Sequence, residues 1–184
     1  MPRRRILQWS ALLVLVAAGA FTFALERSTH ASFGGIDIKG SVAFRARTIE
    51  ALRLMQSDAP REFAEVCAVV TQIRQDARSG TDVETGRVTI ANASSLDVSL
   101  AWFASVLAHE AHHARLFRIE RKHRQGNEVF TAEIDCINVQ LEVLKRLGGN
   151  EREIVWLASK RDGHHPDMDH DGKYTWDDYY KRDW

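Results

Sequence analysis

The stretch ASVLAHEAHHA at residues 104–114 decides how the rest of the sequence is interpreted. It places His109 and His113 four positions apart, with Glu110 directly after the first histidine. Residues four apart lie on one face of an α-helix, so both imidazoles can point at one place. Glu110 lies about 100° further around the helix. Two imidazoles can bind a zinc ion, and a carboxylate can act on the water that the ion binds. These residues therefore predict a zinc site.

Apolar residues flank this motif and predict a buried helix that ends near residue 119. We expect its N-cap at Ser94, Ser95 or Asp97. His112 falls on the remaining polar strip of the helix, so we do not expect it to bind the metal. Two apolar stripes cover most of the circumference: Leu100, Phe103, Leu107, Ala114 and Phe117 on one side, and Trp102, Val106 and Leu116 on another.

A third zinc ligand is expected on a second helix, predicted for residues 131–147. Catalytic zinc usually has three protein ligands and an open fourth position. Glu133 is the best candidate, because a carboxylate at the margin of an apolar face is costly unless a cation compensates it. A salt bridge from Glu133 to Arg115 or Lys145 is the alternative. The other candidate ligands are Asp135, Glu128, Glu120 and His123.

The run His109-Glu110-Ala111-His112-His113, followed by Glu133 on a second helix, resembles the gluzincin branch of the zinc metallopeptidases. The resemblance covers about residues 88–147. It implies that His109, His113 and Glu133 bind zinc in a zincin-like helical domain. It also implies that Glu110 is the general base of a peptidase, which activates water and later passes on the proton.

Two supporting roles of that family have no clear residue in this sequence. Many gluzincins have an aspartate four positions after the glutamate ligand, where it orients a histidine, and this chain has Ile137 there. Asp135 or Asn138 remains for that role. The candidates for stabilising the oxyanion are His123, Tyr174 and Tyr179.

A second metal motif lies near the C-terminus, where residues 167–178 read DMDHDGKYTWDD. This spacing matches an EF-hand calcium loop, with Gly172 at the sharp turn. Asp178 replaces the usual glutamate at position 12, which weakens the expected site. The alternative is a hydrated acidic tail. The predicted calcium ligands are Asp167, Asp169, Asp171, the carbonyl of Lys173, and Asp178.

The N-terminus has the pattern of a membrane anchor. Residues 6–25 form an apolar run long enough to span a bilayer of about 30 Å, and Arg3, Arg4 and Arg5 precede it. We therefore expect a single transmembrane helix with the domain on the extracytoplasmic side. A cleaved signal peptide is the alternative, because Ala18-Gly19-Ala20 has small residues at the required spacing, and the domain would then be secreted.

The remaining patterns predict a mainly α domain with a small β-hairpin or edge strand. We expect an anchor at residues 1–25, a linker at 26–41, the metal-binding domain at 42–160, and an acidic loop and tail at 161–184. Helices are predicted at residues 42–57, from Pro60 to a stop at Ser79-Gly80, and from Asn150 to Ser159. Residues 83–91 are the predicted strand, which either holds extended substrate or covers the core.

The charge composition gives no reason to expect a nucleic-acid partner, but it does not identify the function. The sequence has 25 basic and 25 acidic residues, so no overall field favours a nucleic acid, and no nucleic-acid partner is expected. Cys67 and Cys136 either form a disulfide or are two buried thiols. The sequence therefore predicts a membrane-anchored zinc-dependent hydrolase that acts on peptides or proteins. The alternative is a non-catalytic interaction module that binds zinc and calcium at the membrane.

Overall fold

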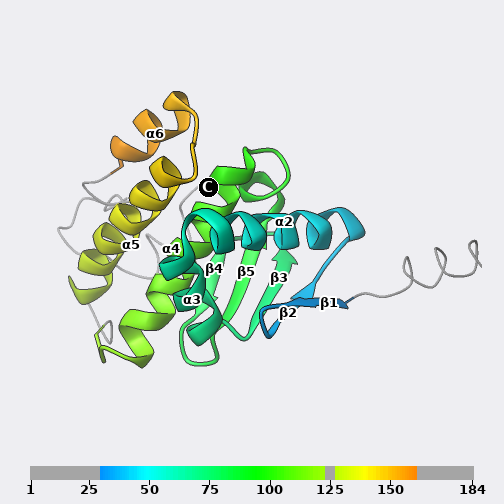
Figure 1. Ribbon diagram of the computed structural model, residues 1–184. Helices are drawn as coiled ribbons and strands as arrows, with labels where there is room; N and C mark the ends of the chain where they lie inside the picture. The colour runs from blue at the N-terminus through cyan, green and yellow to red at the C-terminus, as the bar shows by residue number, and fades with distance from the viewer. Residues whose placement is uncertain (1–29, 123–126, 161–184) are drawn as a thin grey trace, which may run out of the picture.

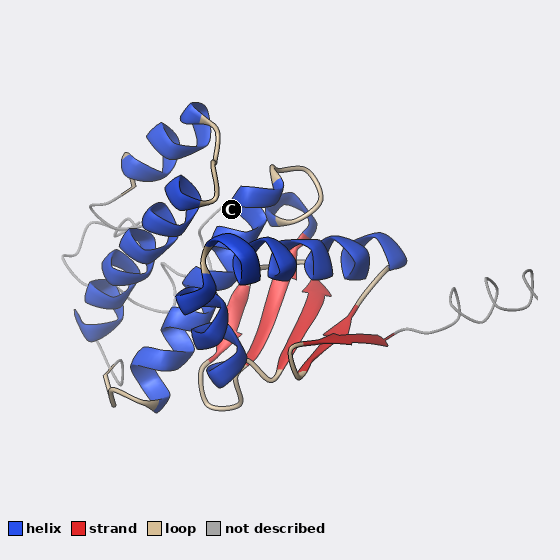
Figure 2. Cartoon of the chain, in the orientation of Figure 1, coloured by secondary structure: helices blue, strands red, loops and turns tan. Residues whose placement is uncertain are grey.

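The computed structural model describes residues 30–122 and 127–160. This part of the chain forms a mixed α/β domain, in which helices lie on one face of a five-stranded sheet (Figures 1 and 2). The prediction of a mainly α domain with a small hairpin is therefore wrong. The sheet has the strand order β1-β2-β3-β5-β4.

The elements follow one another in a βαβ arrangement and then continue as helices. The strands are β1 at His30–Phe33, β2 at Ile36–Lys39, β3 at Gln72–Asp76, β4 at Gly80–Asp82 and β5 at Arg87–Ala91. The helices are α2 at Val42–Asp58, α3 at Pro60–Val69, α4 at Leu100–Arg118, α5 at Asn127–Arg146 and α6 at Glu151–Ala158, with a short 3-10 helix at Asn92–Ser94.

Alternating side chains explain why the strands form a sheet with one buried face. Strand β3 pairs in parallel with β2 and with β5, while β1 and β4 are antiparallel edge strands. Ile38 lies opposite Ile73, and Ile73 lies opposite Val88. The intervening residues, such as Lys39 and Arg74, are less buried. The apolar face is the one that the helices cover.

Strand β3 is the main element that the sequence patterns missed. The helix that begins at Pro60 was expected to continue to Ser79-Gly80, but α3 ends at Val69. Ile73 fits a helical spacing after Val70, yet it also fits a period of two, because Gln72 and Arg74 beside it are less buried than Ile73 itself. Pairing with two neighbouring strands decided between the two periods, because it satisfies the backbone of residues 72–76 on both sides.

The turn before β5 depends on Gly86. Gly86 has φ +71°, a conformation that side chains rarely adopt. A Cβ there would meet the carbonyl oxygen of Val69 at 2.2 Å. Arg118 of α4 donates a hydrogen bond to that same carbonyl oxygen at 2.7 Å. The glycine thus lets the β4–β5 turn, the end of α3 and the end of α4 meet.

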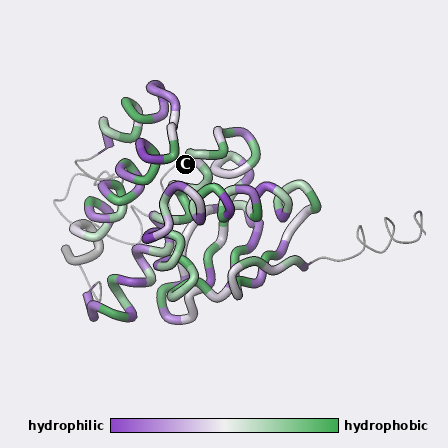
Figure 3. The backbone as a smooth tube through the Cα atoms, in the orientation of Figure 1, coloured by the Kyte–Doolittle hydropathy of each residue, from purple (hydrophilic) through white to green (hydrophobic). Residues whose placement is uncertain are grey.

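Helix α4 occupies the centre of the domain. It packs against α2, α3, α5 and the edge strand β4, and 13 of its 19 residues are buried. Helix α5 packs on α4 and α6, and it lies on the side of α4 away from the sheet (Figure 1). Hydrophobic and hydrophilic residues alternate along α5, as expected of a helix with one packed face (Figure 3).

The ends of the helices follow local capping rules. The Ser99 side chain accepts a hydrogen bond from the backbone N–H of Trp102, so Ser99 caps α4, and not Ser94, Ser95 or Asp97 as predicted. Glu153 of α6 accepts hydrogen bonds from the backbone N–H and the hydroxyl of Ser99, which ties α6 to the start of α4. Asn150 caps α6, as predicted.

Two predictions fall on residues outside the described ranges. The apolar run at residues 6–25 is one, and the calcium loop with Asp167, Asp169, Asp171, Lys173 and Asp178 is the other. Within residues 30–122 and 127–160, no helix has the length and apolarity to cross a membrane. Cys67 and Cys136 are both free thiols, so the disulfide alternative is not what the structure shows.

Candidate metal centre

The two histidines of the central motif face each other on the buried side of α4. Nε2 of His109 lies 3.1 Å from Nε2 of His113. The rings are 4.8 Å apart between their centroids and meet edge to face. This is the convergence that the spacing of four residues predicted. The His113 side chain is 16% exposed, so the pair is close to the surface without being open to it.

Glu133 of α5 points at both histidines, as the sequence predicted for the third ligand. One carboxylate oxygen, Oε1, lies 3.3 Å from Nε2 of His113. The other, Oε2, lies 3.6 Å from Nε2 of His109. Arg115, one alternative partner of Glu133, contacts Glu65 and Glu120, and the other, Lys145, is exposed.

These three separations match the spacing of ligands around zinc. Tetrahedral zinc with bonds of about 2.0–2.2 Å to nitrogen and oxygen keeps its ligand atoms about 3.3–3.5 Å apart. The separations of 3.1, 3.3 and 3.6 Å lie close to that range, and the two that involve Glu133 run to its two different oxygens. The donors are two imidazoles and one carboxylate, a set that zinc accepts. The residues present therefore fit a zinc ion.

Cys136 is a fourth potential donor, and the sequence patterns did not identify it as one. It lies three residues after Glu133 on α5 and is 0% exposed. One donor atom from each of His109, His113 and Cys136 lies within 4.8 Å of the others. The signal was present in the sequence, because residues three apart share a helix face and a thiolate is a common zinc ligand.

The charges around His113 favour a cation at this place. Burial lowers the pKa of His113, but Cys136 and the Glu133 carboxylate raise it, and the net pKa is well above the usual 6.5. Burial raises the pKa of the Cys136 thiol to about 11, although His113 opposes part of that rise. Without a metal, a proton on His113 serves as the positive charge that Glu133 requires. A bound cation would take over that role.

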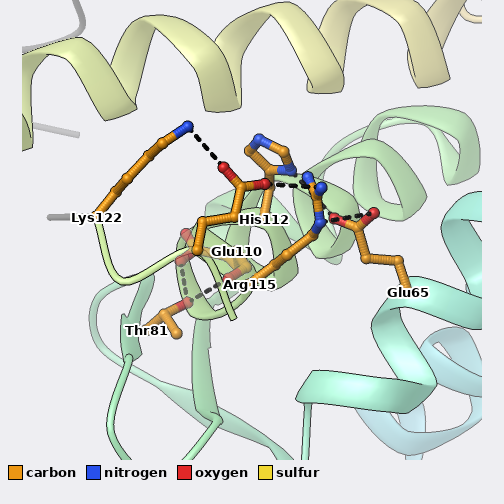
Figure 4. Close-up of polar contacts among 7 residues, drawn as sticks. Glu65, Thr81, Glu110, His112, Arg115 and Lys122 are labelled. Carbon is orange, nitrogen blue, oxygen red and sulfur yellow. Dashed lines mark hydrogen bonds and ion pairs between the residues drawn. The ribbon is translucent and has the colours of Figure 1, made fainter. Parts of the chain in front are cut away.

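Glu110 lies beside the cluster and is held by the edge strand. The hydroxyl of Thr81 on β4 donates to Oε2 of Glu110 at 2.6 Å, and it also lies 3.0 Å from the Glu110 carbonyl oxygen (Figure 4). Glu110 is 7% exposed. Its negative charge acts on the thiol of Cys136, whose pKa it raises. A buried carboxylate, bound by Thr81, therefore follows His109 directly in α4, and its role as a base stays a prediction.

His112 belongs to a different set of contacts, although it is next to His113. Its Nδ1 lies 3.1 Å from Oε1 of Glu65 on α3. Arg115 lies 3.8 Å from Glu65 and 2.7 Å from Glu120, and Lys122 binds the other oxygen of Glu120 (Figure 4). These contacts join α3, α4 and the segment after α4. They give His112 a structural role, in agreement with its place on the predicted polar strip.

The other candidate ligands whose side chains the structure describes do not join the cluster. Asp135 is exposed on α5, and Glu120 is engaged with Arg115 and Lys122. Ile137, at the place of the orienting aspartate, is a core residue with 0% exposure. His123, the side chain of Glu128, Tyr174 and Tyr179 lie outside the described part of the chain.

Comparison with known proteins finds no relative of this chain. No family model, no curated protein and no solved structure matches it.

Proposed function

We propose that this protein is a zinc-dependent hydrolase that acts on peptides or proteins. One observation carries the proposal. The carboxylate of Glu133 from α5 and the two imidazoles from α4 converge at separations suited to one tetrahedral ion, with Glu110 beside them. Three protein ligands leave one position for water, as in catalytic zinc sites. The same arrangement supports the resemblance to gluzincins.

Different residues around the ion would perform different parts of the reaction. His109, His113 and Glu133 would hold the zinc, which would supply Lewis acidity toward a water and a substrate carbonyl. Glu110 takes the proton from the attacking water and returns it to the leaving amine. The hydroxyl of Thr81 holds the Glu110 carboxylate in one orientation before the proton arrives.

Strand β4 is the place where we expect an extended substrate to bind. The sequence left residues 83–91 either to hold substrate or to cover the core, and β5 in that segment pairs on both sides with β3 and β4 and has no open edge. The outer edge belongs to β4, which packs against α4 and carries Thr81. A peptide that pairs with this edge by backbone hydrogen bonds would lie next to Glu110.

Replacement of Glu110 tests the hydrolase proposal. Glu110→Gln keeps the shape and the Thr81 contact but removes the base, so we expect hydrolysis to fall by about 10²- to 10⁴-fold. Zinc content, measured by elemental analysis, should stay at the wild-type level, because Glu110 is not a ligand. Equal hydrolysis of a broad peptide library by the variant and the wild type, or none by either, would contradict the proposal.

A non-catalytic zinc module is the second candidate, and Cys136 is the observation that favours it. Structural zinc sites have four protein ligands and no open position. His109, His113, Glu133 and Cys136 could provide such a set. This candidate predicts that zinc removal lowers the melting temperature while no peptide is cleaved under any condition.

A further inference from the structure

The hydrolase proposal uses three donors, yet the structure brings a fourth to the same place. Cys136 has no part in the proposed reaction, although it is fully buried beside the two histidines. Glu133 and Cys136 project from the same face of α5 toward α4, because they are three residues apart. One turn of α5 therefore offers both a carboxylate and a thiol to the histidine pair on α4.

We propose that the Cys136 thiolate occupies the fourth position of the resting zinc centre and closes it to water. This inference rests on the proposed function, and it adds a regulatory state to the same site. The hydrolase works when the thiolate leaves and a water takes its place. The closed form is latent, because Glu110 then has no bound water from which to take a proton.

Distance makes the closed form accessible. A tetrahedral ion with a sulfur ligand at about 2.3 Å keeps that sulfur about 3.6 Å from its nitrogen ligands. The donor atoms of His109, His113 and Cys136 already lie within 4.8 Å of one another. A side-chain adjustment of about 1 Å is enough to bring the sulfur to the ion.

The charge balance permits the closed form in a buried site. Zinc with two neutral imidazoles, the Glu133 carboxylate and a Cys136 thiolate has no net charge. The same centre with a neutral thiol has a charge of plus one, which is costly to bury unless a neighbouring anion compensates it. Glu110 is that anion in the open form, so its carboxylate and the thiolate are alternative sources of the same negative charge.

The step between the two forms balances with one proton. On closing, the S–H bond of Cys136 breaks, the proton passes to the Glu110 carboxylate, and the sulfur electron pair binds zinc as water leaves. On opening, Glu110 returns the proton to the sulfur and water binds in its place. No oxidant or reductant takes part. The proton on Glu110 explains why the closed form cannot also work as a base catalyst.

Cobalt substitution of the full chain tests whether sulfur is a ligand. Wild-type protein loaded with Co²⁺ should show a sulfur-to-cobalt charge-transfer band in the near ultraviolet. Cys136→Ser should lose the band, and Cys67→Ser, the matched control, should keep it because Cys67 lies outside the cluster. A wild-type protein that binds cobalt without the band would overturn the inference. X-ray absorption of the zinc form gives the same answer without any variant, through the presence or absence of a sulfur scatterer.

The hydrolysis rate of the same samples tests whether the Cys136 thiolate closes the zinc centre to water. If most molecules are closed, removing the thiol should raise the hydrolysis rate of Cys136→Ser by about tenfold, because the competent fraction increases. A lost band with no rise in an otherwise active enzyme would contradict closure. If the band behaves as expected but neither wild type nor Cys136→Ser cleaves any peptide, the hydrolase proposal fails while the sulfur ligand stands.

Discussion

Helices α4 and α5 each contribute to the candidate metal centre, but they do so in different ways. Helix α4 brings His109, Glu110 and His113 from five consecutive residues, and it is enclosed by α2, α3, α5 and β4. Helix α5 brings Glu133 and Cys136 from one turn, and it packs on α4 and α6. The α4 half is fixed by the helical repeat alone. Glu133 and Cys136 of α5 reach the histidines only if the two helices pack in one register.

Because of this difference, we expect α4 to determine whether the metal binds and α5 to adjust how tightly it binds. Substituting His109 or His113 on α4 would remove one of the proposed ligands. Substituting a residue on α5 changes the charge and the number of donors on one side of the ion. We therefore expect the largest effects on α4, smaller ones on α5, and the smallest at the edge strand that supports Glu110.

The adjacent histidines of α4 provide the sharpest contrast. His113→Ala should weaken zinc binding by about 100-fold or more, because it removes a ligand. His112→Ala should leave zinc binding unchanged and lower the free energy of unfolding by about 1 kcal/mol, since it breaks the contact with Glu65. Zinc titration and chemical denaturation of both variants measure this. Loss of zinc binding in His112→Ala would refute the ligand assignment on α4.

Two acidic residues on α5 give the corresponding test for the other helix. Glu133→Gln should weaken zinc binding by about 10- to 100-fold, because the amide oxygen remains near the ion but has no charge. Asp135→Asn changes the same charge at an exposed position, so its zinc affinity should match the wild type. Competition with a chelator measures both variants. Equal affinities for the two would show that α5 supplies no carboxylate ligand.

The pH dependence of zinc binding reports on His113. Its raised pKa means that a proton competes with zinc for the ring at and above pH 6.5, so the affinity should increase as the pH rises through that range. In the metal-free protein a rise in pH has an unfavourable effect, because it lowers the stability of the fold. The stability that His113 contributes is complete below pH 6.5 and is lost as the pH rises through its higher folded pKa.

Zinc titrations and thermal melts at a series of pH values measure these two trends, with His112→Gln as the control. In that control both trends should persist, because His112 is not part of the cluster. A zinc affinity that is constant from pH 6.5 to about one unit above it would show that His113 has no bound proton to lose.

The smallest effect is expected at Thr81, which supports Glu110 from β4. Thr81→Val keeps the shape of the side chain but removes the hydroxyl that binds the carboxylate, so kcat should fall by about tenfold with little change in KM. Thr81→Ser should restore the rate. In Thr89→Val, the neighbouring hydroxyl that binds the Gly80 carbonyl oxygen is lost, and kcat should not change. Similar rates for Thr81→Val and Thr89→Val would remove Thr81 from the catalytic arrangement.

Much of the metal centre could be predicted from local spacing. His109 and His113 converge because they are one helical turn apart, and His112 was separated from them by its position on the helix. Glu133 was predicted because a carboxylate on an apolar face needs a cation. Cys136 was missed because its burial in an apolar pattern also fits an ordinary core thiol. Thr81 gave no signal, since β4 and α4 are brought together by packing alone.

The sequence by itself determined the helices with a clear period of 3.6 residues and the facing histidines within one of them, because a helix places residues by local geometry. Tertiary structure decided the sheet, the end of α3 at Val69, and the set of residues around the metal centre. Strand pairing and helix packing depend on partners far away in the chain. A short pattern such as that of residues 72–76 fits both a helix and a strand, and only pairing with distant strands decides between them.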